Sequence, residues 1–271
     1  MRKWLAVVVF AAALVAVSPG LAAASSPPLP GSMAAIGDSI SQAADVCCWY
    51  GNHPANSWST GYTSWDPVRS HYERILALKP AIYGHNYNDS VSGAKMSDAP
   101  AQAAKAVQQQ AKYVTILMGA NDLCTSSAAT MTSVDTFTSE FRQALATLEA
   151  GLPSTAHIFV ASIPNLYHLW EIYHTDSLAE FTWSTAHICQ SLLSSSNTDT
   201  DRQAVVNRET AFNQVLAQQC AQYANCRFDG GAVHSYAFTQ SQVSKLDYFH
   251  PSLSGEAALA NVTWGASWWG G

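Results

Sequence analysis

A short apolar run that ends in Gly-Asp-Ser constrains this 271-residue chain more than any other stretch. Residues 34–36 are apolar, and Gly37, Asp38 and Ser39 follow them directly. This pattern predicts a buried strand that passes into a turn and the start of a helix. Ser39 would then lie at the carboxyl edge of a sheet, where open α/β folds bind their ligands, beside backbone N–H groups that can hold negative charge. Taken alone, the motif fits an ordinary Ser N-cap better than a nucleophile, so a catalytic interpretation needs a base, an orienting acid and oxyanion donors from elsewhere.

Apolar runs and helical periodicity alternate along the rest of the chain. Residues 113–118 form the clearest predicted strand, since they are β-branched and apolar as in a sheet that is buried on both faces. The other predicted strands are residues 32–36, 81–86, 157–163 and 227–229. The predicted helices are residues 72–78, 101–112 with Asp98 as their cap, 133–150, 166–174, 182–193, 201–223 and 252–268. This alternation predicts an α/β fold with a parallel sheet covered by helices on both faces.

The first 24 residues have the composition of an export signal. A basic start is followed by an apolar run over residues 4–17 and by Ala22-Ala23-Ala24, which is typical of a signal-peptide cleavage site. A membrane anchor is the alternative, but the run is short for a span. We therefore expect a signal peptide over residues 1–24, a single domain over residues 25–271, and a secreted protein without a transmembrane segment.

Charge and cysteine content exclude several classes of function. Removal of Arg2 and Lys3 with the signal peptide takes the formal net charge from −6 to −8, and no basic stripe is present, so we expect no nucleic-acid partner. No Cys-x-x-Cys motif occurs, which argues against a zinc ribbon, and we expect neither a metal nor a cofactor.

Six cysteines in an exported chain favour disulfide bonds over redox or metal chemistry. Cys220 and Cys226 are close enough to close a small loop, and Cys124 with Cys189 is the natural long-range pair. The adjacent residues Cys47 and Cys48 would then form a strained vicinal bridge or pair elsewhere. Many other connectivities remain open, so these pairings are preferences.

A candidate base and its orienting acid stand near the C-terminus, in the segment from Asp247 to Pro251. An Asp and a His three residues apart in a turn can form a local hydrogen bond. The carboxylate then fixes the imidazole tautomer, and the other ring nitrogen is left to take a proton from a serine. The chain contains nine histidines, so one His means little by itself, and the alternative for His250 is a helix-entry residue with a structural hydrogen bond.

Candidate oxyanion donors follow two other predicted strands. Gly93 follows the second strand and allows its backbone N–H to approach a substrate closely. Asn121 follows the strand at residues 113–118, and its side-chain amide can donate to an oxyanion. Each is more simply a turn residue when taken alone. Together with Ser39 and His250, however, they would converge on one edge of one sheet.

In these blocks the chain resembles the SGNH, or GDSL, hydrolase family. The matching blocks are residues 37–40, 92–94, 119–122 and 247–251, which span nearly the whole mature chain. The resemblance implies a three-layer α/β/α sandwich with a central parallel sheet, as in flavodoxin, and esterase or lipase activity without a metal. It also implies the residue roles, with Ser39 as nucleophile, His250 as base and Asp247 as its orienter. The oxyanion hole would consist of the backbone N–H groups of Ser39 and Gly93 and the side chain of Asn121.

Within that family the chain is most similar to the phospholipase B-like branch. The similar stretches are residues 57–61, 91–95 and 119–124, with weaker ones at residues 163–173 and around Cys189. The chain departs from the branch at Ser92, where Pro is common, and at Ala120, where Gly is common. Neither change removes a catalytic atom, and the branch bears only weakly on the substrate class.

The sequence therefore predicts a secreted, monomeric serine ester hydrolase that acts on a small-molecule or lipid ester, phospholipids included, through an acyl-enzyme. Two aromatic segments, residues 49–65 and 166–183, are expected to pack mostly on each other and to place some rings at the acyl or leaving-group site. One alternative is a carbohydrate acetyl esterase on the same machinery, since aromatic loops also stack on sugars. The other is a non-catalytic secreted binding protein that uses its Trp-rich loops.

Overall fold

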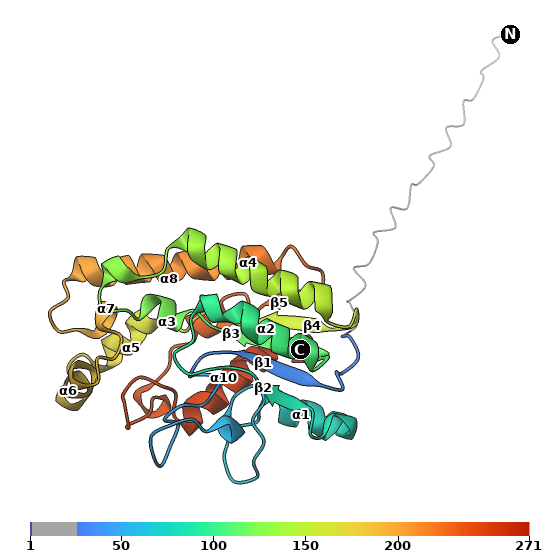
Figure 1. The fold of residues 1–271 in the computed structure, drawn as a ribbon, viewed down its shortest axis with the longest axis horizontal. Helices are drawn as coiled ribbons and strands as arrows, with labels where there is room; N and C mark the ends of the chain where they lie inside the picture. The colour runs from blue at the N-terminus through green and yellow to red at the C-terminus, as the bar shows by residue number, and fades with distance from the viewer. Residues whose placement is uncertain (2–25, 271) are drawn as a thin grey trace.

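A parallel sheet of five strands forms the centre of the computed structural model, which describes Met1 and residues 26–270 (Figure 1). The strands are β1 (Met33–Gly37), β2 (Asn86–Asn88), β3 (Tyr113–Leu117), β4 (His157–Val160) and β5 (Cys226–Phe228). Their order across the sheet is β2-β1-β3-β4-β5, and all pairs are parallel. The expected signal peptide over residues 1–24 lies outside the described residues, apart from Met1.

Helices cover both faces of this sheet (Figure 1). They are α1 (His71–Leu78), α2 (Ala99–Gln108), α3 (Ala120–Leu123), α4 (Val134–Gly151), α5 (Leu166–Tyr173), α6 (Ser177–Thr185), α7 (Gln190–Leu193), α8 (Asp199–Cys220), α9 (Ala232–Ser235) and α10 (Leu253–Ala266). Helices α2, α4 and α8 lie on one face, and α1 and α10 lie on the other. The predicted three-layer α/β/α class is therefore confirmed.

The alternation of side chains along β3 explains the two cores. Val114 and Ile116 point into the core under α2, α4 and α8, whereas Tyr113 and Leu117 point into the core under α1 and α10. Every residue of β1 and β3 is buried, as expected for central strands of a sheet covered on both faces.

Two predicted elements differ from the structure. The strand predicted over residues 81–86 is a 3-10 turn at Pro80–Ile82, and β2 starts only at Asn86. Pro80 fixes the first φ of this turn. Ile82 reaches the core from the turn, and an apolar residue buried there looks in the sequence like a strand residue. The single helix predicted over residues 182–193 is split into α6 and α7 because His187 and Cys189 have φ of 52° and 42°. Residues in this left-handed region cannot continue an α-helix.

Disulfides join Cys124 to Cys189 and Cys220 to Cys226, the two pairings preferred from the sequence. Cys47 and Cys48 are free thiols, so the vicinal bridge considered above is not formed in the structure. Adjacent Cα atoms are about 3.8 Å apart across a trans peptide bond, closer than ordinary disulfide geometry accepts.

Candidate active site

Ser39 lies just beyond the carboxyl end of β1, beside the point where the strand order reverses between β1 and β3. In doubly wound folds of this strand order, this position is where ligands bind. Gly37 is required here because a Cβ would lie 2.7 Å from the carbonyl oxygen of Leu117. The side chain of Gln102 holds both polar groups of the Gly37 backbone, at 2.8 and 3.0 Å. Asp38 Oδ1 then accepts the Ile40 N–H at 3.0 Å, which turns the chain and leaves Ser39 largely buried in the wall of a cleft.

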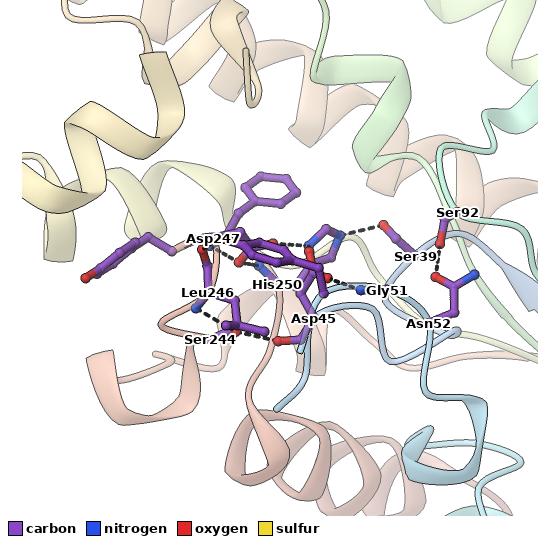
Figure 2. Close-up of polar contacts among 12 residues, drawn as sticks. Ser39, Asp45, Gly51, Asn52, Ser92, Ser244, Leu246, Asp247 and His250 are labelled. Carbon is purple, nitrogen blue, oxygen red and sulfur yellow. Dashed lines mark hydrogen bonds and ion pairs between the residues drawn. The ribbon is translucent and has the colours of Figure 1, made fainter. Parts of the chain in front are cut away.

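Ser39, His250 and Asp247 form a hydrogen-bonded chain (Figure 2). Ser39 Oγ lies 2.7 Å from His250 Nε2. The other ring nitrogen, Nδ1, bonds to Asp247 Oδ2. Asp247 Oδ1 accepts the backbone N–H groups of Phe249 at 2.9 Å and of His250 at 3.1 Å. The local turn thus fixes the carboxylate and the imidazole ring relative to each other. This differs from the alternative considered for His250, a helix-entry residue with one structural hydrogen bond, because both of its ring nitrogens are bonded.

The charges around His250 make it a stronger base. Burial alone would lower the pKa of His250, but the hydrogen bond to Asp247 and the charges of Asp247, Asp45 and Asp38 raise it above its ordinary value. Burial alone would raise the pKa of Asp247, whereas the hydrogen bond and charge of His250 bring it below its ordinary value. An imidazole flanked in this way can accept a proton from a serine and remain stabilised as the imidazolium.

Gly93 and Asn121 lie with the triad in the walls of one cleft of about 570 Å³. Gly93 has φ +82°, a left-handed conformation that favours glycine. The Asn121 amide donates to the carbonyl of Ala94 at 3.0 Å, which orients the side chain beside the Gly93 turn. Asp122, in α3, accepts the N–H of Met96 at 2.8 Å and so holds this helix beside the segment that follows Gly93.

Two backbone donors in this cleft are available to a substrate. In the part of the chain that the structure describes, neither the N–H of Ser39 nor that of Gly93 donates to another protein group. Both residues line the cleft together with His250. The sequence-predicted nucleophile, base, orienting acid and oxyanion donors are therefore all brought together.

Asp45 and Asp38 were not singled out from the sequence, although both lie close to the site. Asp45 Oδ2 is 3.9 Å from His250 Nδ1, the same nitrogen that bonds to Asp247. Asp38 is fully buried, and its burial raises the pKa to about 6. The sequence carried no spacing signal for Asp45, because only the fold of the loop after Ser39 turns its side chain back towards His250.

Asp45, Asp247 and His250 also form the one group of possible metal ligands found among the described residues, with ligand atoms within 4.8 Å of one another. Both nitrogens of His250 are already hydrogen-bonded, to Asp247 and to Ser39. The cluster is therefore arranged for proton transfer.

The aromatic segments contribute less to the cleft than expected. Trp58, Tyr173 and Trp183 are buried in the two cores. From residues 49–65, Tyr50 lines the cleft, and its hydroxyl donates to the carbonyl of Leu246 at 2.9 Å. Phe249 also lines the cleft, and its ring packs edge-on against His250 at a centroid distance of 5.1 Å.

Comparison with known proteins identifies the family of this site. Residues 33–263 match the family described as GDSL-like lipase/acylhydrolase. The chain belongs to this family. It is accordingly a carboxylic ester hydrolase, and the expectation drawn from the SGNH, or GDSL, blocks is confirmed at that level.

Solved structures share the fold of this GDSL-family protein at low sequence identity. A GDSL-like lipase from Parabacteroides merdae is 19% identical with a TM-score of 0.56, over 92% of this chain and 98% of its own. LAE5, an α/β hydrolase from the metagenome of Lake Arreo in Spain, is 15% identical with a TM-score of 0.56, over 89% and 96%. An acetyl xylan esterase, AlAXEase, is 13% identical with a TM-score of 0.53, over 86% and 98%. No protein with curated annotation matches the chain significantly.

Within the described residues, no helix combines the length and the apolar character that crossing a bilayer requires.

Proposed function

We propose that this protein is a serine esterase or lipase that forms its acyl-enzyme on Ser39. The observation that supports this proposal most is the 2.7 Å contact between Ser39 Oγ and His250 Nε2, with His250 Nδ1 held by Asp247 in an open cleft. Ser39 Oγ attacks the ester carbonyl while Nε2 takes its proton. The imidazolium then returns that proton to the leaving alcohol, and water hydrolyses the acyl-enzyme by the same route.

The oxyanion of each tetrahedral intermediate would be bound by three donors. These are the backbone N–H groups of Ser39 and Gly93 and the side-chain amide of Asn121, all at the cleft. The Asn121 amide has two N–H groups, and the bond to Ala94 uses only one of them. Such donors act where charge develops, so they stabilise the transition state more than the bound ester.

The cleft supports an acyl or lipid ester as substrate. Its wall includes Ala186, Ile188 and Phe249 beside the polar triad, so part of it can cover an apolar chain. Each buried CH₂ group contributes roughly 0.8 kcal/mol. We propose that kcat/KM on p-nitrophenyl esters rises from acetyl to at least butyryl, and that glycerol-based lipids, phospholipids included, are cleaved as in the phospholipase B-like branch.

Deacetylation of a carbohydrate is the second candidate. Tyr50 lies at the cleft with 69% of its surface exposed, so its ring is free to stack on a sugar. A sharp preference for acetyl esters, together with release of acetate from acetylated sugars, would favour this candidate over the lipid ester. The non-catalytic binding protein is not retained, since the chain is an ester hydrolase.

We also propose that the enzyme is secreted as one monomeric domain of residues 25–271, after cleavage of residues 1–24. The two disulfide bonds support this, because such bonds form and persist in oxidising compartments. Mass spectrometry of the exported protein would test both the cleavage site and the bonds.

The proposed nucleophile can be tested directly with a fluorophosphonate probe. The wild-type enzyme should be labelled at Ser39, and the Ser39→Ala variant should not be labelled. An ester panel that spans acyl length, phospholipids and acetylated sugars would be assayed in parallel. Normal hydrolysis by a folded Ser39→Ala variant would overturn the proposal.

A further inference from the structure

Asp45 is a second carboxylate beside the imidazole of His250, and the chain holds it rigidly. Its N–H donates to the carbonyl of Gly51 at 2.8 Å, and its Oδ1 accepts the N–H of Gly51 at 2.6 Å. Its carbonyl accepts the hydroxyl of Ser244 (Figure 2). Asp45 has φ +53°, a conformation that is uncommon for a residue with a side chain and best tolerated by Asn and Asp. The loop after the nucleophile is thus fastened to the loop that carries His250.

The side-chain hydrogen bond from the Gly51 N–H uses Oδ1, which leaves Oδ2 beside the imidazole. Oδ2 lies 3.9 Å from His250 Nδ1, and Asp247 Oδ2 bonds to that same nitrogen. The Asp45 side chain is only 18% exposed, and that of Asp247 only 7%. Charges that are shielded from water in this way interact more strongly than an exposed pair.

The negative charges of Asp45 and Asp247 repel each other, but both stabilise a positive charge on His250. Burial and the charge of Asp247 raise the pKa of Asp45, so the two carboxylates compete for a proton. When His250 is protonated, however, its positive charge attracts both carboxylates. Asp38 is the third carboxylate that raises the pKa of His250, from the nucleophile side.

We propose that Asp45 is a second positioning carboxylate for His250, which stabilises the imidazolium and takes over the orienting role when Asp247 is absent. This inference rests on the proposed role of His250 as the base. It predicts that the charge of Asp45 matters modestly while Asp247 is present and strongly once Asp247 is removed.

The test compares Asp45→Asn in two backgrounds, wild type and Asp247→Ala. The Asn side chain keeps an oxygen for the Gly51 N–H and removes only the charge. In the wild-type background kcat should fall by about threefold to tenfold, the range of a partly redundant orienting interaction. In the Asp247→Ala background the same substitution should lower kcat by a further ~10²-fold or more, so that the two changes are synergistic.

A pH profile separates an electrostatic role from a structural one. The acid limb of kcat/KM reports the protonation of the base in the free enzyme. Because Asp45 raises the pKa of His250, Asp45→Asn should move this limb to lower pH. A purely structural role would lower kcat equally in both backgrounds and leave the limb in place, and that outcome would overturn the inference.

Asp66 offers a matched control. Its Oδ1 accepts a backbone N–H two residues along the same loop, from Val68 at 2.9 Å, but it is not among the groups that shift the pKa of His250. Asp66→Asn should leave the pH profile and the kcat of the Asp247→Ala variant unchanged.

Probe labelling at Ser39 distinguishes a failure of this inference from a failure of the proposed function. If the wild-type enzyme is not labelled at Ser39, the proposed function is rejected. If it is labelled normally but Asp45→Asn changes neither kcat nor the pH profile, only the role of Asp45 is rejected.

Discussion

His71 should make the stability of this enzyme depend on pH in a way that a single substitution can remove. It is the first residue of α1 and is completely buried between the sheet and α10. Its Nδ1 lies 2.8 Å from the Tyr113 hydroxyl, and its Nε2 lies 2.9 Å from the Thr263 hydroxyl. Its ring stacks on that of Tyr113 with an interplanar angle of 6°. Both nitrogens are therefore satisfied by neutral partners, and within residues 26–270 no carboxylate raises the pKa of this imidazole.

Burial lowers the pKa of His71 from 6.5 to about 3. Because the folded-state value is the lower one, the unfolded chain binds a proton that the folded chain refuses between these two pH values. The contribution of His71 to stability is therefore complete above pH 6.5 and is lost as the pH falls towards 3. The full loss is about 5 kcal/mol, of which roughly half falls between pH 6.5 and 4.5.

Urea unfolding of the wild type and of His71→Gln at several pH values would measure this effect. The Gln variant should be less stable at pH 7.5, since an amide cannot match both hydrogen bonds and the ring stacking. The gap in unfolding free energy should then shrink by about 2–3 kcal/mol at pH 4.5, because only the wild type has the buried imidazole. The variant His85→Gln, which removes an exposed imidazole, serves as the control. A gap that stays constant from pH 7.5 to 4.5 would refute the reasoning.

Three further predictions concern the site. Replacing Ser39 or His250 with Ala should lower kcat by about 10⁴-fold or more while the circular dichroism spectrum is unchanged. Asn121→Ala should lower kcat by about 10²–10³-fold with little change in KM; a higher KM at constant kcat would make Asn121 a substrate-binding residue instead. Loss of the Cys124–Cys189 bond, which closes a loop of 65 residues, should cost about 4 kcal/mol in urea unfolding at pH 7.5, as measured on the double Ser variant.

Much of the fold could be predicted because the strongest local signals agree with the tertiary structure. The β-branched run of β3 and the amphipathic repeat of α4 each specify one element. The prediction failed where a tertiary contact reversed a local preference. Ile82 is apolar and fully buried, but it reaches the core from a turn. Such a position cannot be separated from a strand by hydropathy alone.

The candidate site could be predicted for a different reason. In a parallel sheet the carboxyl ends of all strands meet at one edge, so residues that follow different strands converge whatever their distance in sequence. Ser39 follows β1 and Asn121 follows β3, and both line one cleft with the loop that carries His250. Motif order was thus sufficient to group these residues.

Asp45 shows where this argument stops. It lies well beyond the end of β1, in the loop after Ser39, and stands at no motif spacing from Ser39 or His250, yet it lies beside His250. Its position depends on a left-handed φ, on two hydrogen bonds with Gly51 and on one from the Ser244 hydroxyl. The sequence pattern reveals neither this backbone conformation nor these contacts. Residues that follow strands are placed by topology, and sequence can reveal them. A residue placed by the path of a loop becomes visible only in the structure, and Asp45 adds its charge there to those of Asp247 and Asp38 around His250.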